Sequence, residues 1–140
     1  MKRTELRDHI FKLVFGMEFH AAEEMKAQTE LYLEGLADAG ERDLEYIRTK
    51  TGRIGENLEE IDRLINDTAK GWKTTRMNKA DLSIIRLAVY EMRWDDDVPV
   101  GVAIDEAVEL AKKYSSDDGP SFINGVLAKL APGTAGEDSR

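Results

Sequence analysis

The sequence contains no cysteine and only two histidines among its 140 residues. The lack of cysteine excludes disulfide bonds, thiolate metal sites and a cysteine nucleophile. The histidines, His9 and His20, do not form a paired-histidine zinc motif, and there is no glycine-rich phosphate loop. The many carboxylates are explained by solvated helix faces and helix starts, which are poor signals for acid–base chemistry. We therefore predict a protein that is not an enzyme and that needs no metal and no cofactor.

Long apolar runs are missing as well. The chain offers no uninterrupted apolar segment for a signal peptide or a membrane span, so we expect a soluble cytoplasmic protein. No stretch alternates apolar and polar residues with a period of two over the length of a strand. The sequence therefore predicts an all-α fold.

Positive charge is scarce, since 20 basic residues stand against 28 acidic ones and the formal net charge is −8. This balance opposes simple nucleic-acid binding, because affinity for phosphates comes largely from lysine and arginine. Any contact with RNA must therefore be local, and the first dozen residues supply a basic patch: Lys2, Arg3, Arg7 and Lys12. The acidic remainder suits a basic partner such as a ribosomal protein, or serves only solubility.

Apolar spacing predicts three helices in the first half of the chain. The first covers Thr4 to His20 and also carries a row of phenylalanines, in which Phe11 is expected in the core and Phe15 at a contact surface. The second covers Glu23 to Leu36. From Leu44 to Ile65 the apolar residues keep one phase, which predicts a single long helix.

Three more helices are expected after the short connection around Gly71 and Trp72. Asn78 caps the first, and apolar side chains surround it from Leu82 to Met92, which places it centrally. Arg86, inside this run, is expected to pair with a carboxylate rather than with RNA. Of the remaining two helices, one follows the three carboxylates Asp95 to Asp97 and Pro99, and the other follows the loop that ends at Pro120. The three carboxylates are interpreted as a signal for the start of a helix rather than as a metal site.

Three segments of the second half carry a family resemblance. They are VAIDEAVELAK at 102–112, FINGVL at 122–127 and DLSIIRLAVYE at 81–91, together with Pro99. This part of the chain, from about Ile61 to Leu130, resembles the NusB family of bacterial transcription antitermination factors, and the first helix agrees more loosely. The resemblance implies two small helical bundles side by side with six or seven helices in all.

The resemblance also implies a function and the residues that serve it. Members of the family bind the boxA element of nascent RNA together with NusE, a small-subunit ribosomal protein, within the RNA polymerase antitermination complex. The implied RNA-binding residues are Lys2, Arg3, Arg7, Asp118, Phe122 and Asn124. Phe15 and Asp81 match positions that face NusE.

Each transferred role has a plain alternative. Phe122 is either a platform on which an RNA base stacks or a core residue, and Asn124 either reads a base edge or caps loop backbone. Many relatives carry a basic residue immediately before the phenylalanine, where this chain has Ser121. This departure favours weak RNA binding by the chain alone.

We predict an N-terminal subdomain at 1–70, a C-terminal subdomain at 71–132 and a disordered tail at 133–140. The function indicated is an RNA-binding adaptor. The alternatives are a module serving ribosomal RNA modification, and a helical module that binds only proteins or forms a homodimer. A fused modification enzyme is disfavoured because no cofactor-binding βαβ unit is evident.

Overall fold

The computed structural model describes residues 1–36, 38–68, 71 and 73–133. These residues form seven α-helices and one 3-10 helix without any strand, which confirms the predicted all-α class and helix number. They divide into two compact units, residues 1–57 and 58–140. Within the described part, no helix has both the length and the apolar character needed to cross a membrane. The predicted disordered tail lies outside the described residues, except for Gly133.

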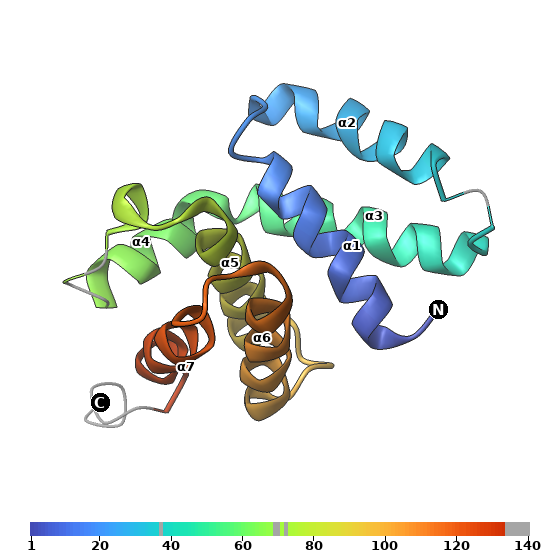
Figure 1. Ribbon diagram of the computed structural model, residues 1–140. Coiled ribbons are helices and arrows are strands. Elements are labelled where there is room, and N and C mark those ends of the chain that lie inside the picture. The colour runs from blue at the N-terminus through green and yellow to red at the C-terminus, as the bar shows by residue number, and fades with distance from the viewer. Residues whose placement is uncertain (37, 69–70, 72, 134–140) are drawn as a thin grey trace. The chain divides into compact units, whose positions relative to one another are not determined.

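The first unit contains the helices α1 (Arg3–Gly16), α2 (Ala22–Glu34) and α3 (Glu41–Glu56), and α3 contacts both of the others (Figure 1). Helix α1 ends at Gly16, before the predicted end at His20. Apolar side chains from all three helices form the core of this unit. Those that are 4% exposed or less include Ile10, Phe11, Leu13, Val14, Leu33, Ile47 and Ile54. Phe11 is thus buried as predicted.

Polar contacts join the helices of the first unit. The His9 Nδ1 atom lies 2.7 Å from the Tyr32 hydroxyl and links α1 to α2. Between α3 and α2, the Arg48 Nε and Nη2 atoms donate to the two carboxylate oxygens of Glu30 at 2.6 and 3.1 Å. These hydrogen bonds lower the pKa of Glu30, so the stability that this contact adds is present at neutral pH and is lost as the pH falls through the lowered pKa.

The single long helix predicted from Leu44 to Ile65 is wrong. The chain leaves the helix at Asn57, with φ −103° and ψ 9°, and the Asn57 side-chain amide donates to the carbonyl of Arg53 at 2.8 Å. A new helix, α4 (Leu58–Thr68), starts at once, so the apolar phase continues through the break. The boundary between the units consequently falls after Asn57 and not at residue 70, and α4 belongs to the second unit.

The second unit is built around α5 (Lys79–Trp94), which contacts α4, α6 (Val100–Tyr114) and α7 (Gly119–Leu130) (Figure 1). Every residue of α5 from Asp81 to Met92 is buried, which confirms the predicted central position. A 3-10 helix, η1 (Thr74–Arg76), forms part of the connection between α4 and α5. Trp72, in the same connection, lies outside the described residues.

Arg86 on α5 is 4% exposed and pairs with Asp62 on α4. Its Nε and Nη2 atoms donate to the two oxygens of the Asp62 carboxylate at 2.8 and 2.7 Å. This two-pronged geometry suits a guanidinium group that is removed from water. The predicted structural ion pair is confirmed.

Candidate functional site

The start of α5 is organised by two polar side chains. The Asn78 side-chain oxygen accepts hydrogen bonds from the backbone N–H groups of Ala80 and Asp81 at 2.8 and 3.2 Å, so the predicted cap is confirmed. Asp81, which the resemblance places toward NusE, is only 8% exposed. It is buried because the connection between α6 and α7 packs against it: Ser115 Oγ donates to Asp81 Oδ1 at 2.5 Å.

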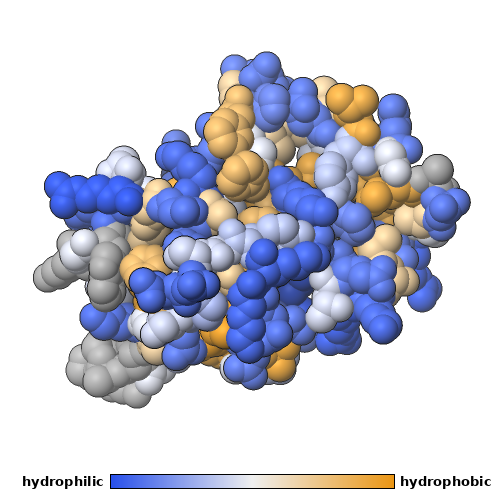
Figure 2. Space-filling view, in the orientation of Figure 1, coloured by the Kyte–Doolittle hydropathy of each residue, from blue (hydrophilic) through white to orange (hydrophobic). Residues whose placement is uncertain are grey.

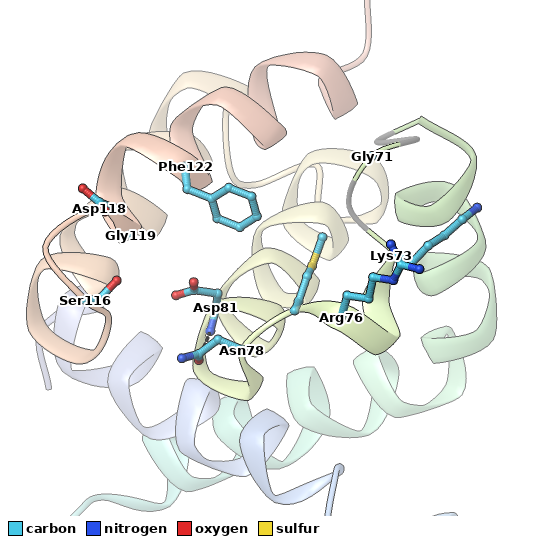
Figure 3. A pocket seen from close by; sticks show the side chains of 10 residues that line it. Gly71, Lys73, Arg76, Asn78, Asp81, Ser116, Asp118, Gly119 and Phe122 are labelled. Atoms are coloured by element: carbon cyan, nitrogen blue, oxygen red, sulfur yellow. Dashed lines mark hydrogen bonds between the residues drawn. The ribbon is translucent and has the colours of Figure 1, made fainter.

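An open pocket of about 350 Å³ lies beside this helix start, within the second unit. It is lined by Gly71, Lys73, Arg76, Met77, Asn78, Asp81, Ser116, Asp118, Gly119 and Phe122. Figure 3 shows the Phe122 ring directed from α7 into the pocket, with Lys73 and Arg76 on the far side and the Asp118 carboxylate directed away from the ring. The pocket thus combines an aromatic face with a cationic edge.

Phe122 is half-buried, which distinguishes it from the closed core around Ile123 and Val126 on the same helix. One part of the ring is supported by the protein and another part faces the pocket. Aromatic rings in this situation stack on nucleotide bases, and each stacked base adds about 1 to 3 kcal/mol to binding. Phe122 is therefore not enclosed in the core, and its role as a platform for a base stays a prediction.

Lys73 and Arg76 are the two cationic residues of this pocket, and neither is predicted from the sequence as a site residue. Both are exposed; Lys73 is the cap residue that precedes η1, and Arg76 is the last residue of η1. Exposed cations near an aromatic platform can hold the phosphates of the nucleotide that stacks there. Their proximity to Phe122 could not be read from the sequence, because 45 or more positions separate them; the two cations in Lys73-Thr74-Thr75-Arg76 were the available signal.

Asn124 and Ser121 face a different hollow. They line a shallow depression of about 610 Å³ between α6 and α7, together with Asp105, Val108, Glu109, Lys112 and Pro120. Asn124 is exposed. The structure therefore brings Phe122 and Asp118 to one pocket and places Asn124 at another surface of the same helix.

The predicted residues of the first unit divide by exposure. Lys2 and Arg3 are exposed at the start of α1, as phosphate contacts must be. Arg7 is only 5% exposed, so its guanidinium group does not present itself to solvent as the other two do. Arg3 and Arg7 are four residues apart and therefore lie on nearly the same side of α1, but Arg3 is at the exposed start of the helix, whereas Arg7 is buried one turn further along. The role of Arg7 in RNA binding stays a prediction.

Phe15 and Phe19 form an aromatic pair at the end of α1. Their ring centroids lie 5.1 Å apart; Phe15 is half-buried and Phe19 is 61% exposed. The face in Figure 2 is mostly hydrophilic, with apolar groups gathered in small areas. An exposed aromatic side chain in contact with a half-buried one is typical of a contact site for another protein.

Among the described residues, no group of three or more His, Cys, Asp or Glu side chains is arranged to hold a metal ion. The three carboxylates Asp95 to Asp97 instead make a local turn, in which the Asp95 side chain accepts a hydrogen bond from the Asp97 N–H at 3.1 Å. Pro99 is then the cap residue that precedes α6. The run thus forms the turn between α5 and α6, and its predicted role as a helix-start signal is not seen, because none of the three carboxylates caps α6 or lies in its first turn.

Comparisons with known proteins agree on one family. The NusB family model matches residues 4–132 of the chain. The transcription antitermination protein NusB of Agathobacter rectalis is 48% identical over 131 residues, which cover 94% of this chain and 100% of that protein. The solved structure of T. maritima NusB has a TM-score of 0.82 and 33% identity, and the match covers 94% of this chain and 91% of that one.

A further solved structure contains the antitermination factors NusB and NusE in complex with double-stranded RNA. It matches with a TM-score of 0.80 over 99% of this chain and 97% of that chain. At 22% identity, this likeness shows a shared fold alone.

Proposed function

The chain belongs to the NusB family of transcription antitermination factors and is not an enzyme, and we propose that it acts as an adaptor that binds boxA-like RNA and a ribosomal protein of the NusE type. The adaptor would join both to the RNA polymerase complex on nascent ribosomal RNA. We place this activity in the cytoplasm. The solved complex of NusB and NusE with RNA supports the choice of partners, since the fold is shared.

One observation carries the RNA part of the proposal. The half-buried Phe122 ring faces an open pocket whose other side carries the exposed cations Lys73 and Arg76. Binding sites for single-stranded RNA usually combine an aromatic ring, on which a base stacks, with nearby cations, which neutralise the phosphates. Asp118 borders this pocket, and Asn124, two residues after Phe122, lies on another surface of α7, where its amide can both donate and accept. Lys2 and Arg3 on the first unit supply further phosphate contacts in this proposal.

The protein partner is assigned to the first unit on chemical grounds. Phe15 and Phe19 offer apolar contact area, and the acidic surface, reflected in a net charge of −8, attracts a basic ribosomal protein. Asp81, the other residue that the resemblance places toward the partner, is buried and accepts a hydrogen bond from Ser115, so the proposal does not use it as a direct contact.

Replacing Phe122 with alanine tests the proposed function. We expect RNA affinity to fall about tenfold, because one stacked base is lost, while the dependence of affinity on salt stays unchanged because no charge is removed. Titration of labelled boxA-like RNA at several salt concentrations measures both quantities. A neighbouring exposed residue of the same helix, Ala128→Gly, serves as the control for an altered α7. Unchanged affinity of the Phe122→Ala variant would refute the RNA-binding site.

A second variant tests the cations. The double replacement Lys73→Ala and Arg76→Ala should reduce the slope of log affinity against log salt by about 1.4, since each lost contact with single-stranded RNA removes roughly 0.7. All RNA sequences should weaken alike, because phosphates carry no sequence information. The matched control is Lys26→Ala with Arg53→Ala, which removes two exposed cations from the first unit. If both double variants change the slope equally, only net charge matters and the pocket has no special role.

The rival functions give different results in the same assays. A module that binds only proteins would capture the ribosomal protein but show no response to Phe122→Ala in RNA titrations. A module serving ribosomal RNA modification would bind structured ribosomal RNA without any gain from the ribosomal protein.

A further inference from the structure

The connection between α6 and α7 is tied to the start of α5 by one hydrogen bond across the second unit. Ser115, the residue that ends α6, donates its hydroxyl proton to Asp81 Oδ1 at 2.5 Å. The acceptor is a carboxylate that is only 8% exposed, so the bond is charge-assisted and poorly accessible to competing water. We call Asp81, Ser115 and Gly119 the α7 latch.

Gly119 allows the residues of the α7 latch to pack tightly. A Cβ atom added at this position would lie 1.8 Å from Ser115 Oγ and 2.4 Å from Ser115 Cβ, and 3.7 Å from Asp81 Oδ1. The first residue of α7 therefore rests directly against Ser115, where only glycine fits without displacing a neighbour. The latch determines where α7 begins.

The start of α7 in turn determines where the Phe122 ring lies. Phe122 is in the first turn, and its backbone N–H donates to the carbonyl of Asp118 at 3.0 Å. Ser116, Asp118, Gly119 and Phe122 all line the pocket, so the segment that the latch holds is also the wall that carries the ring (Figure 3). A displacement of this segment changes how far the ring projects into the pocket.

We propose that Asp81 and Ser115 are positioning residues for RNA binding: they hold the α6–α7 connection so that Phe122 presents its ring to an RNA base. This inference rests on the proposed function and adds a role for two residues that do not touch the RNA. It also accounts for a carboxylate at the start of α5 that is turned toward Ser115 and away from solvent.

The test is a double-mutant cycle between the latch and the ring. Ser115→Ala should weaken RNA binding roughly fivefold when Phe122 is present, and should have no further effect in the Phe122→Ala background, because the latch acts through the ring. The salt dependence should remain that of the unmodified protein, since no cation is lost. Ser121→Ala is the matched control, because it removes a hydroxyl from an exposed serine of α7 that does not line this pocket.

Asp81 provides a second arm that does not depend on Ser115. Asp81→Asn keeps an oxygen that can accept the Ser115 hydrogen bond and should keep most of the RNA affinity, whereas Asp81→Ala should lose it to the same extent as Ser115→Ala. Thermal unfolding verifies that each variant is folded at the titration temperature. Equal loss in both Asp81 variants would show that charge and not the hydrogen bond is needed, and would overturn the inference.

The two proposals fail in distinguishable ways. If Phe122→Ala leaves RNA affinity unchanged, the RNA site itself is wrong. If Phe122→Ala weakens binding while Ser115→Ala does not, or if Ser115→Ala weakens binding equally in both backgrounds, the RNA site stands and the latch inference is wrong.

Discussion

Replacing Asp62 with alanine is expected to lower the free energy of unfolding of the second unit by about 2 to 3 kcal/mol. The replacement removes the carboxylate that accepts both the 2.8 Å and the 2.7 Å hydrogen bonds from Arg86, whose side chain is 5% exposed. A guanidinium group cannot lose its proton to escape burial, so its charge is less well compensated once this carboxylate is gone. Urea unfolding followed by circular dichroism measures the change.

Two further variants separate the ion pair from a general effect of charge. Asp67→Ala removes an exposed carboxylate from the same helix, α4, and should change the unfolding free energy by less than about 0.5 kcal/mol. Adding Arg86→Met to Asp62→Ala should restore part of the lost stability, because a buried apolar side chain needs no partner. A loss in Asp67→Ala as large as that in Asp62→Ala would contradict the argument.

RNA binding by the chain alone is expected to be weak, and the NusE-type ribosomal protein should tighten it about 100-fold. The physical reason is charge, because the chain carries a formal net charge of −8. Each unit has only two of the exposed cations that are proposed to contact RNA phosphates: Lys2 and Arg3 in the first unit, and Lys73 and Arg76 in the second. A basic partner adds positive surface for the same RNA. Titrations of labelled RNA with the chain, the partner and both together, all at one salt concentration, measure the gain.

Linkage makes this prediction stricter, because RNA must tighten the association of the two proteins by the same factor. A pull-down of the ribosomal protein with and without RNA checks that second half of the cycle. Ser121→Lys, which adds a cation at an exposed position beside Phe122, should strengthen binding by the lone chain and so narrow its gap to the pair; Ser121→Ala is the control. Tight binding by the isolated chain, or no gain on adding the partner, would be incompatible with the adaptor proposal.

Local patterns in the sequence predicted most of the helices. Asn78 capped its helix as expected, because a cap depends on groups only two and three residues away. The burial of residues 81–92 followed from apolar side chains on every face of one helix. The continuous helix from Leu44 to Ile65 was a wrong prediction because α4 resumes in the phase of α3, and periodicity cannot detect a break that preserves phase.

The sequence by itself determined the all-α class, the family and the presence of an aromatic residue and cations suited to RNA. These properties depend on composition, on periodicity and on short motifs, all of which involve neighbours along the chain. The tertiary structure decided that Arg7 is buried while Arg3 is exposed, that Asp81 holds Ser115, and that Lys73 and Arg76 share a pocket with Phe122. Those outcomes depend on contacts between residues 34 or more positions apart, or on where along a helix its burial begins. No local pattern contains that information, because the packing of the helices determines it.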